Sequence, residues 1–382
     1  MRDGTCIRST PISSVLSPIS TMPSMTSTTI SIPTRSHPMP DLRTEYLGLE
    51  LRSPLVASAG PHTGNPDKWA ELDAAGVGAI VLPSLFEELI EQEMDEIDNL
   101  FSLHADSFGE AGSFMPEVDG FGNVTDNYLS LVESAKKAMS VPVIASLNGT
   151  HAGGWLRYAK LLEEAGADAI ELNLYVIGAD SSVDAATSEA EQLEVIRTVS
   201  ETVDIPINVK LSPFYSSLAN FLVQVEQAGA AGVALFNRFY APDIDLETLD
   251  IDLKIALSNQ NELRLPLRWI GIAHSLVSMS IAGTTGVHCG RDAAKLILAG
   301  ADVAMSTSAL LFHGPSYIST LESELVEWMK GHNYESVSEM RGAVSRDSTA
   351  DPDAYERANY IINLRSYASR FLSGRSVPRL DS

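Results

Sequence analysis

The sequence predicts an α/β protein built as a single (β/α)₈ barrel, the TIM-barrel architecture, with a disordered N-terminal extension and a helical C-terminal tail. Eight short apolar runs are separated, in most cases, by amphipathic stretches of helical period, as repeated βα units require. The length of 382 residues suits one such barrel with extensions. A doubly wound open sheet is the alternative, but no G-x-G-x-x-G motif follows the first run.

Four of the runs begin with the same Ala-Gly pattern. In each, an amphipathic stretch such as residues 155–165 ends at a glycine, which suits the left-handed position that follows a helix. An apolar run comes next, as expected for a strand buried on both faces. The four copies are Ala75–Leu82, Ala165–Leu172, Ala228–Leu235 and Ala299–Met305.

The other runs open with proline, which a strand tolerates at its first residue because the hydrogen-bond ladder has not begun. They are Val141–Ser146, Ile205–Lys210 and Leu265–Ile270, and Pro54–Ser58 completes the eight predicted strands. A further helix is predicted over Asp292–Leu298. Catalytic residues of such barrels lie at the C-terminal ends of the strands, so the residues that end each run are the candidate site.

The predicted domain organisation has three parts. Residues 1–40 hold 16 Ser or Thr and six Pro with scattered apolar residues, which predicts a disordered extension. A misassigned start is the alternative because Met39 precedes globular sequence, and a transit role is a third reading. The barrel covers residues 41–330 and a partly helical tail 331–382. Residues 99–127 are typical of a lid or binding loop.

Composition excludes several function classes. Fifty acidic against 26 basic residues give a net charge of −24, which disfavours a nucleic-acid-binding surface. Two cysteines cannot form a disulfide framework or a zinc site on their own, so no metal is expected. No apolar run reaches the length of a membrane span. Together with the lack of a secretory signal, this predicts a cytoplasmic protein.

The predicted strand ends carry small and polar residues. The first run ends in Ala57-Ser58-Ala59-Gly60, whose small side chains let a flat ligand approach the backbone. Asn173 and Asn237 could bind the edge of a heterocycle, and Lys210 adds a positive charge beside them. Each residue alone could be a polar group satisfied inside the barrel. Their shared position at the functional rim favours a binding site.

A phosphate site is predicted on the loops after the last two strands. The relevant residues are Gly283, Thr284, Thr285 and Gly286 after the seventh run and Thr307 and Ser308 after the eighth. In barrels of this type these loops and a nearby helix N-terminus bind phosphate through backbone N–H groups. Cys289, in the same loop, is interpreted as a small buried residue rather than a reactive thiol.

These residues resemble the FMN-dependent dihydroorotate dehydrogenases, particularly the soluble class 1 enzymes, from about Leu42 to about Ser345. The resemblance implies that FMN lies along Ala57–Gly60 with its phosphate on the two loops. It also implies that Lys210, in Val209–Pro213, contacts the N1/O2 edge of the flavin. The residues that would hold a pyrimidine substrate are Asn123, Asn173 and Asn237.

Two departures from the family affect proton transfer. The family motif Asn-Leu-Ser-Cys-Pro-Asn supplies the catalytic base after the fourth strand, but here the base position falls on Val176. Tyr175 is the nearest hydroxyl and becomes the candidate base, with Ser84 and His62 as other groups at the rim. A family lysine after the second strand is replaced by Pro83. The chain therefore resembles a divergent branch in which the flavin site is kept and the proton-transfer site is rebuilt.

The resemblance implies an FMN-dependent oxidoreductase acting on a CH–CH bond, with dihydroorotate oxidation to orotate in pyrimidine (UMP) biosynthesis as the family reaction. One alternative is a flavoprotein that has lost this chemistry; another is a Schiff-base aldolase or synthase with Lys210 as nucleophile. The expected partners are a small dihydropyrimidine and a second copy of the chain, as in soluble relatives. The electron acceptor is not predicted, because the sequence has no NAD fingerprint.

Overall fold

The computed structural model describes residues 39–89, 124–148, 152–238, 242–252, 254–356, 360–361 and 364–366. The chain divides into two units, Met1–Met39 and Pro40–Ser382, and nearly every described residue belongs to the second. The predictions for the N-terminal extension, for Asn123 and for most of the 99–127 loop and the C-terminal helix lie outside these residues. Among the described residues, no helix has the length and apolar character needed to cross a membrane.

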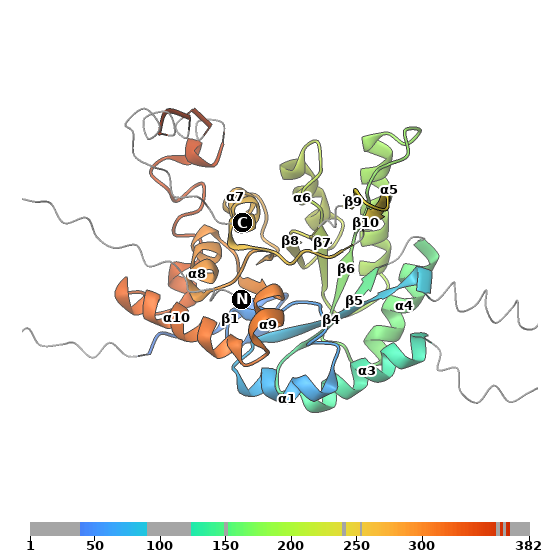
Figure 1. Cartoon of the computed structure of the whole chain (residues 1–382), viewed down its shortest axis with the longest axis horizontal. Helices are drawn as coiled ribbons and strands as arrows, with labels where there is room; N and C mark the ends of the chain where they lie inside the picture. Colours follow the sequence, from blue (N-terminus) through green and yellow to red (C-terminus); the bar gives the residue numbers. More distant parts are fainter. Residues whose placement is uncertain are drawn as a thin grey trace, which may run out of the picture. The chain divides into compact units, whose positions relative to one another are not determined.

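Eight parallel strands close into a barrel, which confirms the predicted fold class (Figure 1). Around the barrel the order is β11-β12-β3-β4-β5-β6-β7-β8. The strands are β3 Leu55–Ala57, β4 Ala79–Phe86, β5 Val143–Asn148, β6 Ala169–Asn173, β7 Ile207–Leu211, β8 Gly232–Leu235, β11 Ser280–Gly283 and β12 Val303–Ser306.

The predicted strand at Leu265–Ile270 is wrong, because these residues lie in helix α7 (Arg264–Ala273). Pro266 occupies the first turn of that helix, where a missing N–H breaks no helical hydrogen bond. Pro266, Ile270 and Ala273 are buried at helical spacing. The seventh strand of the barrel is instead β11, so Ala282 and Gly283 belong to a strand rather than to the loop after it.

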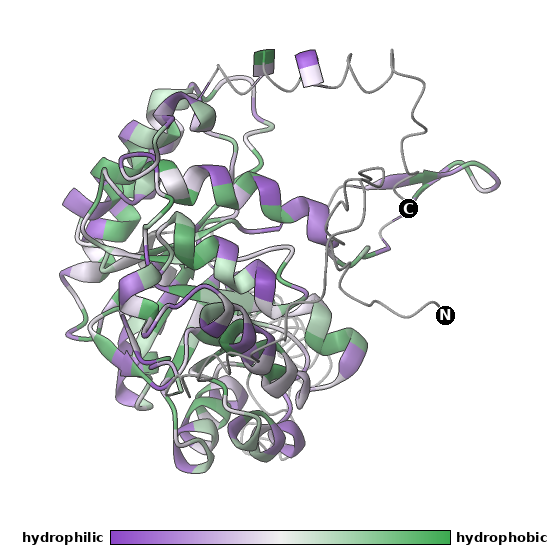
Figure 2. Cartoon of the chain, turned by 90° about the vertical axis from the view of Figure 1, so that its left-hand side faces the viewer, coloured by the Kyte–Doolittle hydropathy of each residue, from purple (hydrophilic) through white to green (hydrophobic). Residues whose placement is uncertain are grey.

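The helices surround the barrel and carry both hydrophobic and hydrophilic residues (Figure 2). The glycines predicted to end four of the segments, Gly76, Gly166, Gly229 and Gly300, have φ between +92° and +128°, as that position requires. The described helices are α1 Pro66–Ala74, α3 Val124–Ala138, α4 Ala152–Glu164, α5 Ala185–Ser200, α6 Leu218–Gln227, α7, α8 Gly290–Ala299, α9 Ser308–His313, α10 Tyr317–Gly331 and α11 Val337–Met340, with 3₁₀ turns at Gln260–Leu263 and Pro352–Tyr355.

A hairpin packs into the N-terminal half of the barrel. It consists of β1 (Thr44–Tyr46) and β2 (Leu49–Leu51), and its buried residues form one cluster with the small apolar side chains that point into the barrel. Gly232 is part of this fit, since a Cβ there would lie 2.4 Å from Leu47 Cδ2. The N-terminal half of the barrel interior is therefore filled by apolar side chains. A ligand site is expected at the opposite end, where the strands have their C-termini.

Candidate active site

The interior of the barrel changes from apolar to polar toward the C-terminal ends of its strands. Side chains alternate along a strand, so in β6 Ala169 joins the apolar interior cluster, and Glu171 and Asn173 follow it on the same face. In β7 the corresponding residues are Asn208 and Lys210. The cross-strand partners are Glu171 with Asn208 and Asn173 with Lys210, so these four side chains form one polar group.

Lys210 forms a buried ion pair with Glu171. Its Nζ lies 3.3 Å from Glu171 Oε1, and the two side chains are 11% and 0% exposed. Asn208 Nδ2 donates to the other oxygen, Glu171 Oε2, at 3.1 Å. A buried carboxylate needs both a countercharge and hydrogen bonds to offset lost hydration, and these two neighbours supply them. The sequence reasoning identified Lys210 but not Glu171 or Asn208 as part of the site.

The two predicted substrate asparagines of the described chain lie together. Asn237 Nδ2 donates to Asn173 Oδ1 at 2.5 Å, and the backbone N–H of Asn237 donates to Leu211 O at 2.7 Å. The second bond fixes the residue just beyond the end of β8. Since an Asn side chain has two donor hydrogens and an acceptor oxygen, a pair joined by one bond keeps further groups to offer a ligand.

The two predicted phosphate loops follow the neighbouring strands β11 and β12, and the second loop lies next to the first strand of the barrel. Thr285 and Gly286, after β11, have consecutive positive φ values of +77° and +82°. Thr307, after β12, caps α9 without a side-chain capping bond, and its Oγ1 lies 3.5 Å from Ala59 O. Gly60 fits against Thr307, because a Cβ at Gly60 would lie 2.7 Å from Thr307 Cγ2. The predicted residues of the two loops and of the first strand's end are thus brought to one side of the barrel mouth.

Residues around the second loop hold it in place. The Ser258 hydroxyl donates to Ser308 Oγ at 2.8 Å, and Ser258 Oγ lies 3.4 Å from His288 Nε2. Burial lowers the pKa of His288. Cys289 is buried and its Sγ lies 3.3 Å from Asp292 Oδ2 at the start of α8. This supports the interpretation of Cys289 as a structural residue.

The groups proposed for proton transfer occupy three different places. Val176 is 45% exposed on the loop after β6, and Tyr175 beside it is half-buried. Ser84 Oγ lies 2.8 Å from Ser146 Oγ on the neighbouring strand β5. His62 Nε2 lies 3.0 Å from Leu310 O, on the α9 side of the barrel. Val176, the position that the family resemblance assigns to the catalytic base, carries a side chain that cannot accept a proton.

Pro83, which the resemblance aligns with a lysine of the family, is held by a tyrosine from outside the barrel. Tyr128 of α3 donates its hydroxyl to Pro83 O at 2.6 Å and accepts a hydrogen bond from Ser146 N at 3.1 Å. Burial raises the pKa of Tyr128, so it remains a neutral donor. This contact could not be predicted from the sequence, because Tyr128 is an inward-facing residue of an ordinary amphipathic helix.

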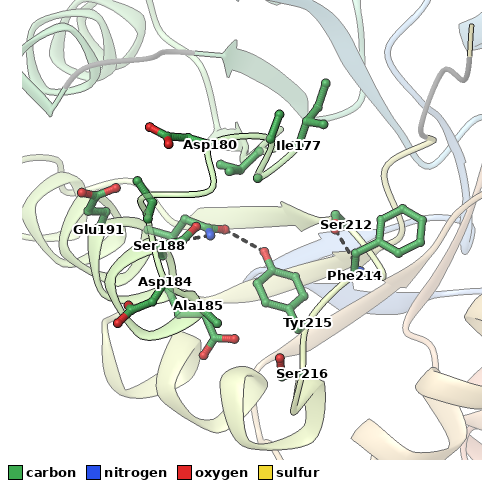
Figure 3. Close-up of a pocket in the computed structure, with 16 residues that line it drawn as sticks. Ile177, Asp180, Asp184, Ala185, Ser188, Glu191, Ser212, Phe214, Tyr215 and Ser216 are labelled. Carbon is green, nitrogen blue, oxygen red and sulfur yellow. Dashed lines mark hydrogen bonds between the residues drawn. The ribbon is translucent and has the colours of Figure 1, made fainter.

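A pocket of about 500 Å³ opens beside this end of the barrel, between the segments that follow β6 and β7 (Figure 3). Tyr215 and Gln192 form part of its wall, joined by a 2.7 Å hydrogen bond from the tyrosine hydroxyl. Its apolar lining includes Val176, Ile177, Val183 and Phe214, and its carboxylates are those of Asp180, Asp184, Glu189 and Glu191. Val176 thus borders a cavity large enough for a small ligand.

Comparisons with known proteins agree with this geometry. Residues 41–329 match the family described as dihydroorotate dehydrogenase. The catalytic subunit of dihydroorotate dehydrogenase B (NAD(+)) of Endomicrobium trichonymphae is 24% identical over 324 residues, covering 81% of this chain and 98% of the relative. The same subunit of Methanothermobacter thermautotrophicus is 26% identical over 307 residues, with 79% and 97% covered. The chloroplastic dihydropyrimidine dehydrogenase (NADP(+)) of Arabidopsis thaliana is 24% identical over 368 residues, with 87% and 84% covered. The family match spans most of the chain, and the chain therefore belongs to the dihydroorotate dehydrogenase family.

Proposed function

We propose that this protein is an FMN-dependent oxidoreductase that removes two hydrogens from a CH–CH bond of a dihydropyrimidine, with dihydroorotate to orotate as the reference reaction. The observation that carries the proposal is the convergence of the Lys210 cation, the Asn173–Asn237 pair and two phosphate-type loops at one end of the barrel. The names of the similar proteins support this reaction class. They give no comparable support to an aldolase.

The residues present fit FMN. The loop after β11 turns through positive φ values at Thr285 and Gly286, and backbone N–H groups of tight turns are among the donors that bind anions. A short extra helix after the eighth strand, here α9, accompanies many barrel phosphate sites. The small side chains of Ala57–Gly60 would let a flat ring approach the backbone, and Lys210 would supply the cation for its edge. Bound FMN would accept the hydride equivalent from the substrate carbon.

The remaining steps are assigned to residues of this chain. Asn173 and Asn237 would orient the pyrimidine ring by hydrogen bonds to its edge. Tyr175 is proposed to take the proton from the adjacent carbon, since Val176 cannot. A phenol is a weak base at neutral pH, so we expect proton removal to be slow.

A second candidate is a flavoprotein that acts on a different unsaturated substrate. Two observations favour it over an unchanged family reaction: Val176 stands at the base position, and it lines the pocket described above. In this case FMN would bind at the same site, but dihydroorotate would not reduce it.

The experiment that separates these candidates is the visible spectrum of the purified protein after reconstitution with FMN, recorded before and after anaerobic addition of dihydroorotate. Bleaching of the flavin band supports the first candidate. A flavin that only photoreduction bleaches supports the second. Failure to bind FMN would remove both.

We also propose a homodimer, with an exposed hairpin as part of its interface. Strands β9 (Asp243–Asp245) and β10 (Asp250–Asp252) pair Ile244 with Ile251, and both isoleucines are 60% exposed. A two-stranded hairpin with an apolar face is marginal in water, so a covering partner would stabilise it. Sedimentation equilibrium should show a dimer that Ile244→Asp weakens, while Leu265→Asp on α7 should leave it intact.

A further inference from the structure

The carboxylate of Glu171 has no role in the function proposed above. It is fully buried and forms an ion pair with Lys210, the residue proposed to contact the flavin. It accepts from Lys210 Nζ at 3.3 Å and from Asn208 Nδ2 at 3.1 Å, one contact to each oxygen. Both contacts come from β7, the strand next to β6 in the barrel. The arrangement therefore couples the side chain that would face the cofactor to a charge one layer deeper in the barrel.

The orientation of Asn208 follows from this carboxylate. Its Oδ1 is buried and has no hydrogen-bond partner among the described residues, while its NH₂ group points to Glu171. Exchanging the two amide ends would place an oxygen against a carboxylate oxygen and leave the NH₂ group unsatisfied. One buried acceptor without a partner costs less free energy than this alternative. The observed orientation of Asn208 therefore suits a Glu171 carboxylate that accepts hydrogen bonds.

The ion pair has two consequences for Lys210. First, the contact holds Nζ near the C-terminal end of the barrel instead of leaving a flexible four-carbon chain to choose its position. Second, the negative charge offsets part of the field of the ammonium group. Charges act over longer range in a dry interior than in water, so a ring that contacts Lys210 also experiences Glu171.

We propose that Glu171 is a positioning residue that fixes Lys210 and lowers the reduction potential of the flavin. Reduction adds negative charge to the flavin at neutral pH, and a cation at its edge stabilises that charge. Glu171 weakens this stabilisation, which makes the bound cofactor easier to reoxidise. The inference rests on the proposed FMN site, because it concerns the electronic state of that cofactor.

The test compares the flavin reduction potential of the wild-type holoprotein with that of Glu171→Gln, which keeps the shape of the side chain and one acceptor oxygen but removes the charge. We expect the reduced form to gain about tenfold in equilibrium constant, a positive shift of about 30 mV for a two-electron couple. Asp168→Asn is the matched control, because it removes a carboxylate from the Lys136–Asp168 ion pair, between α3 and the residue before β6. That variant should leave the potential unchanged.

A second variant keeps the proposal testable if Glu171→Gln does not fold. Glu171→Asp retains the charge one methylene farther from Lys210 and should give a smaller shift in the same direction. A folded, FMN-loaded Glu171 variant whose potential equals that of the wild type would overturn this inference and leave the FMN site standing. A wild-type protein that binds no FMN would instead overturn the proposed function, and this inference with it.

Discussion

Replacement of Gly286 by alanine tests the phosphate loop most directly. Gly286 has φ of +82°, and a Cβ there would lie 2.5 Å from the backbone nitrogen of Leu263. Gly48, in the turn between β1 and β2, offers a matched control with φ of +74° and no heavy atom within 4 Å of the added Cβ. Both substitutions introduce the same backbone strain, so their difference isolates the steric contact.

The expected losses of stability follow from the backbone strain and from the steric contact. A left-handed conformation costs an L-residue roughly 1–2 kcal/mol, which sets the expected loss for Gly48→Ala. The neighbour of Gly286 is backbone, which cannot move aside like a flexible side chain, and overpacking of this kind costs roughly 1–3 kcal/mol more. Gly286→Ala should therefore lower the free energy of unfolding by about 2–5 kcal/mol. The loss of unfolded-chain entropy on replacing glycine is common to both variants and cancels.

The assay has two readouts. Urea unfolding at constant m-value gives the stability difference between the variants. Quenching of FMN fluorescence gives the affinity, which we expect Gly286→Ala to weaken by at least about tenfold, or about 1.4 kcal/mol, with Gly48→Ala unchanged. Equal destabilisation by the two variants would refute the steric argument. Unchanged FMN affinity in folded Gly286→Ala would place the phosphate elsewhere.

Three further predictions follow from the site. Val176→Ser should raise the rate of flavin reduction by dihydroorotate in stopped-flow measurements, and an unchanged rate would remove this position from the mechanism. Lys210→Met should destabilise the fold by about 3–5 kcal/mol in denaturant titration because it leaves Glu171 buried without its countercharge, and the Lys210→Met/Glu171→Gln double variant should recover part of this loss. Since burial lowers the pKa of His288 below its usual 6.5, the unfolded state binds more protons in that interval, so stability should rise with pH up to about 6.5. His288→Gln should flatten that slope in urea titrations at pH 5 and 7.5, and an unaltered slope would contradict the assignment.

Much of the fold was predictable because most βα units carry local sequence signals at their boundaries. The glycine after each helix and the apolar run after it mark a helix end and a buried strand, as at Gly166 and Ala169–Asn173. The segment Leu265–Ile270 was misassigned because a leading proline suits a strand start and a first helical turn equally. Strand β11 was missed because Ser280–Gly283 is short and contains only one large apolar residue. Its strand conformation depends on pairing with the neighbouring strands β8 and β12.

The site was predictable to the extent that it depends on strand ends. Asn173, Lys210 and Asn237 were placed correctly at the rim because topology alone sends strand C-termini to one side. Glu171 and Asn208 were missed, although the alternation of side chains put each two residues before a chosen one on the same face. What the sequence could not supply was the pairing across strands, because register depends on how the barrel closes.

The structure gives a physical reason to expect that substitutions at the proposed cofactor site cost more stability than a substitution at Val176. The proposed cofactor site includes the backbone geometry at Gly60, Thr285 and Gly286 and the ion pair between two strands. Because these features are part of the packed fold, we expect a single substitution there to lower stability. Val176, which the resemblance assigns to the base position, is an exposed loop residue whose side chain is not part of the packed interior. Substitution at such a position changes the free energy of unfolding little. We therefore expect this barrel to tolerate a change of side chain at Val176 more readily than a change at the loops and the ion pair of the proposed cofactor site.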